Sequence, residues 1–182
     1  MTETTKSPVT RIVKMYRSKR LALATISLMT ALTCGTCGTP DDYLVDKSTG
    51  IGYRLVYQAQ TWPVARDRCA DEGAKLAVPK TLNEYLFMQK LVRGMQYSSI
   101  TGSDYKLVVW LGIHNLDDYR IWKNVDGENI NETGFHKWSR GNGDGFSDAP
   151  EEPHCAGLDA VNWLRDFWCH RRQPYICQIK PI

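Results

Sequence analysis

The sequence lacks an uncharged apolar run of the roughly 20 residues that a membrane-spanning helix needs, since its longest such run covers only residues 21–32. It also lacks a Gly-rich phosphate-binding loop, a helical His-Glu-x-x-His motif and any recognisable pairing of a nucleophile with a base. No Pro-, Gly- or Ser-rich linker and no repeat divides the chain after Asp41. We therefore expect neither a stable membrane span nor an enzyme, and we predict a single domain over residues 41–182.

A net positive charge is confined to the N-terminus. The net charge is +3, but the first 38 residues carry six Lys or Arg and a single acid, so the remainder has two more acidic than basic residues. This balance gives no electrostatic basis for binding nucleic acid. Hydrophobic residues make up 42% of the chain and charged residues 24%. That composition supports a globular core and excludes a disordered or collagen-like protein.

The N-terminus has the order of a secretory signal peptide. Basic residues end at Lys19-Arg20, the apolar run follows, and small residues occupy positions 33–38. We predict that residues 1–38 are a signal peptide and that the protein is secreted into the extracellular space. A retained type II anchor is the alternative, because the segment before Leu21 is long and no Ala-x-Ala sequence fixes the cleavage position.

The cysteine count fits export. There are six of them: Cys34, Cys37, Cys69, Cys155, Cys169 and Cys177. Cleavage after Gly38 would leave an even four, which in an exported chain predicts two disulfides with three pairings open. Zinc binding through Cys34 and Cys37 is the alternative, but no second pair follows at finger spacing. The sequon at Asn131 predicts a glycoprotein if the chain is exported.

Two helices are predicted in the first half of the domain. Thr61 is a candidate N-cap for a helix that ends at Gly73, and Thr81 with Glu84 forms a capping box at the start of a second helix. The apolar face expected for the second helix is Leu82, Tyr85, Leu86, Met88 and Val92.

Short strands and a long loop are predicted around these helices. A strand at 53–57 precedes them, and a nearly all-apolar strand at 107–113 follows. The remaining elements are a strand at 120–122 before an Asp126-Gly127 turn, an irregular loop at 139–154, and closing strands at 156–161 and 175–179. This order predicts an α+β fold.

Several motifs together resemble the C-type lectin-like domain. They are Trp62-x-x-Ala65-x-x-x-Cys69-x-x-x-Gly73-Ala74-x-Leu76-Ala77, Trp110-Leu111-Gly112-Ile113, Trp122 with Asp126-Gly127, Trp138, Cys155, Cys169 and Tyr175-Ile176-Cys177. The resemblance spans residues 53–178 and is nearest to secreted arthropod haemolymph lectins that bind lipopolysaccharide. It implies the C-type lectin-like fold, with two helices, short antiparallel sheets and a long irregular loop. It also implies the disulfides Cys69–Cys177 and Cys155–Cys169, worth about 4.7 and about 3 kcal/mol on a loop-entropy model.

In sugar-binding members of this family, Ca²⁺ is held by a Glu-Pro-Asn or Gln-Pro-Asp triplet, a Glu and an Asn-Asp pair. Counted from Trp138, the triplet falls on Asn142-Gly143-Asp144 and lacks its proline. The Glu position falls on Pro153, and the Asn-Asp pair falls on Arg165-Asp166. Arg165 would place a cation where an amide should coordinate.

Two interpretations of this loop stay open. One is a degenerate Ca²⁺ or sugar site that draws on the oxygens of Asn142, Asp144, Asp148, Glu151, Glu152 and Asp166, with Asp144 and Asp166 as metal ligands. The other is a polar, solvent-exposed loop in which Asp166 caps a turn.

The predicted function is recognition of carbohydrate or lipopolysaccharide on microbial surfaces, as part of innate immunity. The predicted carbohydrate-binding residues are Asn142, Asp144, Glu151, Glu152, Trp163 and Asp166. Trp163 or Trp168 could stack on a sugar, whereas Trp110, Trp122 and Trp138 are expected in the core. Arg165, Arg171 and Arg172 form either an anion-binding patch or ordinary solvated charge. The alternative function is a lectin-like module that binds a protein partner without sugar or Ca²⁺.

Overall fold

The structure is a computed structural model that describes residues 42–180 apart from 104, 107 and 144–151. The predicted signal peptide, with Cys34 and Cys37, lies outside the described residues. So do three candidate ligands of the long loop: Asp144, Asp148 and Glu151.

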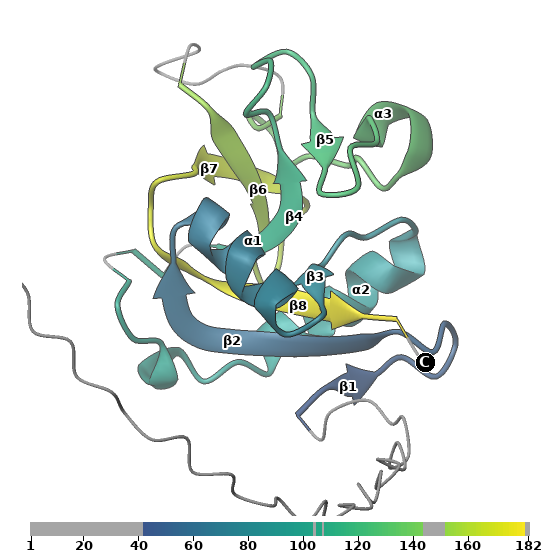
Figure 1. Ribbon diagram of the computed structural model, residues 1–182, viewed down its shortest axis with the longest axis vertical. Coiled ribbons are helices and arrows are strands. Elements are labelled where there is room, and N and C mark those ends of the chain that lie inside the picture. The colour runs from purple at the N-terminus through teal and green to yellow at the C-terminus, as the bar shows by residue number, and fades with distance from the viewer. Residues whose placement is uncertain (1–41, 104, 107, 144–151, 181–182) are drawn as a thin grey trace, which may run out of the picture. The chain divides into compact units, whose positions relative to one another are not determined.

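One mixed sheet organises the described residues (Figure 1). Its strands run in the order β1 (Leu44–Val45), β2 (Gly52–Gln60), β8 (Gln173–Ile179), β4 (Val109–His114), β6 (His154–Leu158) and β7 (Arg165–Trp168). Two short strands pair off this path: β3 (Lys75–Leu76) with β8, and β5 (Lys123–Asn124) with β4. Every pairing is antiparallel except that of β4 with β8, where Trp110 lies opposite Tyr175. The sheet therefore brings β4 and β8 together in its middle, although 65 residues of sequence separate their registered positions.

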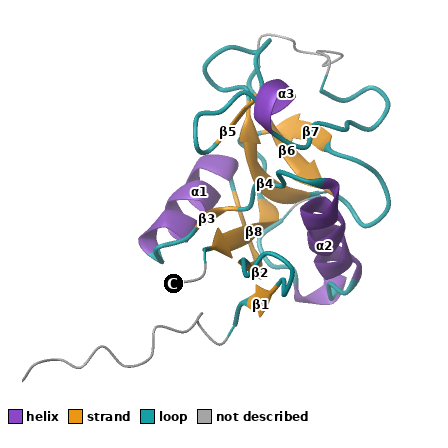
Figure 2. Ribbon diagram, turned by 90° about the vertical axis from the view of Figure 1, so that its right-hand side faces the viewer, coloured by secondary structure: helices purple, strands orange, loops and turns teal. Residues whose placement is uncertain are grey.

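Both predicted helices are present and begin where their caps place them. Helix α1 (Trp62–Asp71) has Thr61 as N-cap, and Gly73 follows it with φ +73°. Helix α2 (Leu82–Arg93) has the predicted capping box, in which Glu84 N donates to Thr81 Oγ1 and Thr81 N donates to Glu84 Oε2, both at 3.2 Å. The two helices are separated in the view of Figure 2 by β3 and β8.

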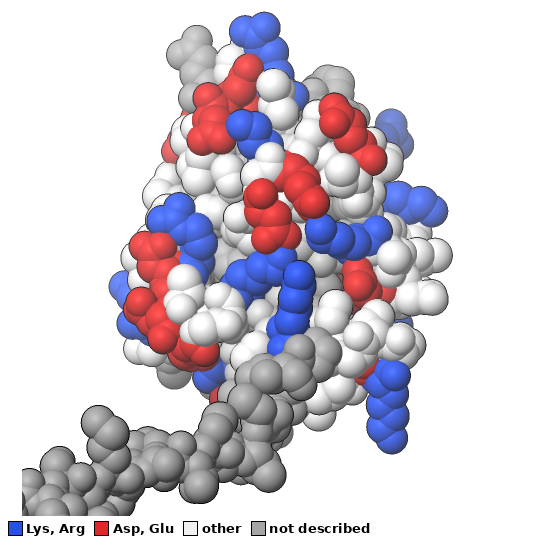
Figure 3. All heavy atoms as spheres, turned by 45° about the vertical axis from the view of Figure 1, so that its right-hand side comes forward, with Lys and Arg blue, Asp and Glu red and all other residues white. Residues whose placement is uncertain are grey.

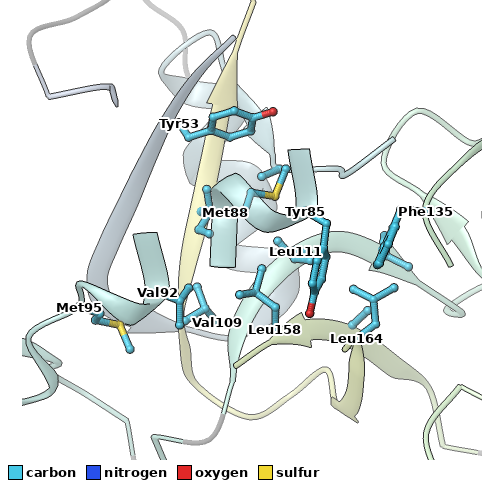
Figure 4. Packing of buried hydrophobic residues seen from close by; sticks show 14 of the residues in the cluster. Tyr53, Tyr85, Met88, Val92, Met95, Val109, Leu111, Phe135, Leu158 and Leu164 are labelled. Atoms are coloured by element: carbon cyan, nitrogen blue, oxygen red, sulfur yellow. The ribbon is translucent and has the colours of Figure 1, made fainter. Parts of the chain in front are cut away.

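The core contains two clusters. The larger lies under α2, where Tyr85 and Met88 pack with Leu111, Leu158 and Leu164 (Figure 4). The smaller contains tryptophan and cysteine residues of the family motifs: Trp62, Trp110, Cys69, Cys155, Cys169 and Cys177. The indole of Trp62 donates to Leu111 O at 2.7 Å and that of Trp110 donates to Gln60 O at 3.0 Å. These bonds satisfy both buried donors and tie the start of α1 and the end of β2 to β4.

The structure contains the two disulfides that the resemblance implies. Cys69–Cys177 joins α1 to β8 across 108 positions of sequence, and Cys155–Cys169 joins β6 to the end of β7 across 14. The expected core positions of Trp110 and Trp122 are confirmed, while Trp138 is half-buried.

Several sequence predictions were wrong in detail. The strand expected at 120–122 lies at Lys123–Asn124, and the one expected at 156–161 covers His154–Leu158, because Asp159 begins a turn by accepting from Val161 N and Asn162 N. On α2, Leu82 and Leu86 are exposed rather than part of the buried face. Strands β1, β3 and β7 and a one-turn helix α3 (Ile130–Thr133) were not anticipated, since each is too short to show periodicity.

Candidate functional site

The described part of the long loop rests against the segment that leads into β7. Leu164 N donates to Lys137 O at 3.0 Å, and Ser139 N donates back to Leu164 O at 2.8 Å. This exchange forms a parallel bridge between Trp138 and Leu164. Residues 139–143 and 159–166 therefore form one continuous surface, called the loop face below.

Asn142 and Asp166, both predicted as site residues, are brought together at the centre of the loop face. Asp166 N donates to Asn142 Oδ1 at 3.1 Å, and Gly143 N donates to Asp166 Oδ2 at 3.0 Å. The amide nitrogen of Asn142 donates to Arg140 O at 3.1 Å. These side chains thus fix the backbone of the loop, so that one carboxylate oxygen of Asp166 is without a contact among the described residues.

Two tryptophans pack together and contact the loop at Gly143. The rings of Trp122 and Trp138 lie 4.5 Å apart between centroids, and Trp122 Nε1 donates to Gly143 O at 2.8 Å. Gly143 has φ +79°, and a Cβ at this position would overlap the ring of Trp138. A glycine is therefore required here for two reasons, backbone conformation and space.

Trp163 is the exposed aromatic residue of the loop face, with 40% of its surface accessible. One side of its ring packs on Phe135 and Tyr85, at centroid distances of 6.0 and 5.7 Å. Its carbonyl accepts from Ser139 Oγ at 3.1 Å, and the Lys137 ammonium lies 5.2 Å from its ring centroid. The ring is thus held in place while part of it remains open to solvent. Trp168 is half-buried beside Arg171, so of the two tryptophans Trp163 is better placed for a ligand.

Arg165, the cation in the position of a coordinating amide, turns toward Asp159. Its Nη1 lies 3.4 Å from Asp159 Oδ2. Burial raises the pKa of Asp159, but hydrogen bonds from Asn162 and from Val161 N, together with the Arg165 charge, outweigh it and hold the pKa below its ordinary value. Asp159 is thereby charged at neutral pH, and it anchors the turn that presents Trp163. Sequence reasoning missed this role, although an Asp three residues before an Asn is a recognisable turn signal.

Glu152, another predicted site residue, lies elsewhere. The register of β6 with β7 sets Asp166 opposite Ala156, whereas Glu152 precedes β6 and its Oε1 is 3.1 Å from His170 Nδ1, beyond the far end of β7. A cavity of about 280 Å³ adjoins this pair, lined also by Thr61, Pro63 and Pro153. The structure therefore does not bring Glu152 to Asn142 and Asp166.

The described residues do not fit a Ca²⁺ site. Ca²⁺ takes six to eight oxygen ligands, but Asn142 Oδ1 and Asp166 Oδ2 each accept from a backbone N–H group, and both oxygens of Asp159 are engaged. Within the described ranges, no group of three or more His, Cys, Asp or Glu side chains comes together to hold a metal. The pair of metal ligands predicted from sequence, Asp144 and Asp166, has one member outside those ranges.

The structure does not bring the side chains of Arg165, Arg171 and Arg172 together as one basic patch, which was one of the two interpretations of these residues. β7 separates Arg165 from the other two, which lie beyond its opposite end. Arg171 lies between the rings of Tyr105 and Trp168, at 5.6 and 5.7 Å from their centroids, and Arg172 donates to Gln60 Oε1 at 3.3 Å. Figure 3 likewise shows basic and acidic side chains interspersed on the face that it draws.

Two further features concern the cellular location of the protein. Asn131 is exposed on α3, which leaves the predicted glycosylation site accessible. Across residues 42–180, where described, no helix combines the length and apolar character needed to cross a membrane.

Comparison with curated proteins finds weak similarity spread over most of the chain. The CD209 antigen of Symphalangus syndactylus is 24% identical over 127 residues, covering 70% of this chain and 29% of that protein. The hemolymph lipopolysaccharide-binding protein of Periplaneta americana is 24% identical over 137 residues, covering 73% and 51%. Human polycystin-1 is 25% identical over 149 residues, covering 78% and 3%. The chain therefore spans about half or less of the length of these relatives.

Solved structures share the fold at low identity. The carbohydrate-recognition domain of the mouse scavenger receptor C-type lectin superimposes with a TM-score of 0.62 at 20% identity, covering 79% of this chain and 98% of that one. A calcium-independent type II antifreeze protein gives 0.61 at 18% identity, covering 82% and 99%. These likenesses confirm the α+β, disulfide-stapled fold. The family described as "Lectin C-type domain" matches residues 58–179, and the chain belongs to this family of C-type lectin domains.

Proposed function

We propose that this protein is a non-enzymatic recognition protein that binds glycan on its loop face, with the lipopolysaccharide of microbial surfaces as the ligand class to test first. The observation that carries the proposal is Trp163, an exposed ring packed on Phe135 and Tyr85 three residues before Asp166 in the loop face. An aromatic face of this kind packs against the C–H face of a sugar, and neighbouring polar groups fix the orientation. The family assignment and the name of the cockroach relative support the same class.

The neighbours of Trp163 suit a glycan. Lys137 offers an ammonium over the ring, and Asp166, three residues further along the chain, offers a carboxylate oxygen that accepts no hydrogen bond from a described residue. Sugar hydroxyls need both donors and acceptors, and a charged lysine also suits a phosphate substituent.

Binding on this face does not depend on Ca²⁺ in our proposal. The oxygens of Asn142 and Asp159 already accept hydrogen bonds, and Arg165 supplies a positive charge beside Asp159. A divalent cation would have to displace these contacts and approach a guanidinium. Sugar affinity is therefore expected to survive chelation.

The extracellular location is part of the proposal. Two disulfides suit an oxidising compartment, and the exposed sequon at Asn131 is available for a glycan of the protein's own. We propose that residues 1–38 direct export and that the secreted chain acts in innate immunity.

The test is a glycan and lipopolysaccharide binding screen of the purified protein, run with Ca²⁺ and with chelator. Trp163→Ala should lower affinity about tenfold or more, because it removes a stacking surface and its apolar burial. Tyr119→Ala is the matched control, since Tyr119 is equally exposed at 43% but its ring contacts Arg120 away from the loop face. Its affinity should stay within twofold of the unaltered protein.

A second variant separates two possible contributions of Asp166: accepting a hydrogen bond from the loop backbone and supplying negative charge to a metal. Asp166→Asn keeps an oxygen that can accept from Gly143 N but removes the charge that a metal would need. Unchanged binding supports the Ca²⁺-independent proposal. Loss of binding both in this variant and with chelator would restore a Ca²⁺ mechanism. No binding by folded protein in any condition would favour a module that recognises a protein partner.

A further inference from the structure

A second candidate binding site lies on the other side of α2. A groove of about 540 Å³ is bounded by β1, β2 and α2. Its wall is mainly apolar, with Leu44, Val45, Leu55, Phe87 and Leu91 among the lining residues. The volume lies within the range of small-molecule sites, which are concave, mostly apolar and contain few polar groups.

Helix α2 separates this groove from the loop face. Tyr85 Oη and Gln89 Nε2 donate to Asn162 O at 2.6 and 2.9 Å, so one side of the helix supports the turn at residues 159–162. Phe87, Lys90 and Leu91 line the groove. Residues 85 and 89 share one helical stripe, and residues 87, 90 and 91 share another. The groove can therefore bind a ligand without contact with the loop face.

Two residues of the groove are apolar yet open to solvent. Leu44 is 61% exposed and Val45 is 40% exposed, and both lie on the two-residue edge strand β1. Across the groove Phe87 packs on Tyr53, with ring centroids 5.4 Å apart. Apolar side chains thus face one another over an open groove, which is the arrangement that favours an apolar chain between them.

Charge at the groove favours one class of ligand. Its acidic member, Asp42, is already paired with Arg54 at 2.9 Å. Its basic member, Lys90, is exposed and makes no ion pair with any described residue. A ligand with an apolar chain and an anionic head would match an apolar wall with one free ammonium.

We infer that this groove binds a single-chain anionic amphiphile, such as a fatty acid anion, with its chain between β1 and α2 and its carboxylate at Lys90. Each methylene that enters the groove leaves water, and the head gains an electrostatic partner. The inference is independent of the proposed glycan function, because no residue of the loop face takes part.

Calorimetric titration of the purified protein with the saturated fatty acid anions from octanoate to dodecanoate tests whether the alkyl chain of the ligand contributes to binding. Affinity should rise about fourfold per methylene, because about 0.8 kcal/mol of transfer free energy corresponds to that ratio. Dodecanol should bind more weakly than dodecanoate, and dodecyltrimethylammonium more weakly still. Binding without chain-length dependence, or with the cation preferred, would overturn the inference.

Two variants with matched controls locate the site. Leu44→Asp, at an exposed wall position, should lower dodecanoate affinity about tenfold, whereas Leu82→Asp, at a position that is also exposed but lies on α2 outside the groove, should not. Lys90→Glu should lower the affinity for dodecanoate about three- to tenfold and leave the affinity for dodecanol unchanged. Arg140→Glu, at an exposed basic residue outside the groove, is the control. Circular dichroism and thermal unfolding verify that each variant is folded.

Further outcomes are decisive against the inference. A groove covered by other parts of the chain would take up no amphiphile at all. Binding that Leu44→Asp and Lys90→Glu leave unchanged would place the ligand elsewhere. Capture of the amphiphile only from lipid vesicles, and not from free solution, would assign the surface to membranes instead.

Discussion

The region around α1 and the loop face are built on the same sheet but held in different ways. Around α1, fully buried Trp62 and Trp110 and the Cys69–Cys177 bridge pack helix, β4 and β8 together. On the loop face, side chains such as Asn142 and Asp166 hydrogen-bond to backbone. Apolar burial tolerates many substitutions that keep volume, whereas these polar contacts depend on individual residues. The comparison shows how such a domain can keep its fold while its site diverges.

Removing the disulfides gives the largest test of this difference. A Cys69→Ala/Cys177→Ala variant should lose about 4.7 kcal/mol of unfolding free energy and a Cys155→Ala/Cys169→Ala variant about 3 kcal/mol, because the longer closed loop costs the unfolded chain more entropy. Denaturant unfolding of both variants measures the two losses of unfolding free energy, which can then be compared. Equal losses, or a larger loss for the shorter loop, would contradict the entropic explanation.

The scaffold could be predicted from sequence because its determinants are local or strongly patterned. The capping box at Thr81 and Glu84 predicts the start of α2, and the apolar run before His114 predicts β4. Leu82 and Leu86 were assigned wrongly because three apolar stripes run along α2, and only contacts show which of them is covered. β7 escaped prediction, since four half-buried residues show no clear alternation.

The site was predictable only in part. The contact between Asn142 and Asp166 joins two of the predicted residues, but their hydrogen bonds run between side chain and backbone over 23 or 24 positions of sequence. Side-chain-to-backbone contacts of that range leave no periodic pattern. Glu152 was grouped with them because it lies one position before Pro153, where the family has a Glu, whereas in the structure its carboxylate lies beside His170.

Two glycines of the loop face test how tightly it is held. Gly143→Ala should destabilise by about 3 kcal/mol, since the residue has φ +79° and its new Cβ would overlap the Trp138 ring. Gly141→Ala is the matched control, because φ is +75° but nothing lies within 4 Å of the added Cβ. It should cost only about 1–2 kcal/mol of backbone strain.

Thermal unfolding gives the stabilities, and glycan titration gives the consequence for binding. If the loop face is as rigid as the contacts of Trp122, Trp138 and Gly143 indicate, only Gly143→Ala should also weaken glycan affinity. Equal behaviour of the two variants would show that the backbone at Gly143 moves away from Trp138 at little cost.

Acidification gives the smallest effect, confined to the turn that presents Trp163. The folded-state pKa of Asp159 lies below its ordinary value of 3.8, so this carboxylate stabilises the turn above that value and loses its contribution as pH falls through the lowered pKa. The indole N–H resonance of Trp163 should therefore shift with pH below about 4, and Asp159→Asn should abolish the shift while leaving the hydrogen-bond acceptor in place. Asp46→Asn is the control, because Asp46 has a pKa lowered by hydrogen bonds from Ser48 but lies in the turn between β1 and β2. A shift of Trp163 that persists in Asp159→Asn would mean that another group, and not this anchor, controls the loop face in acid.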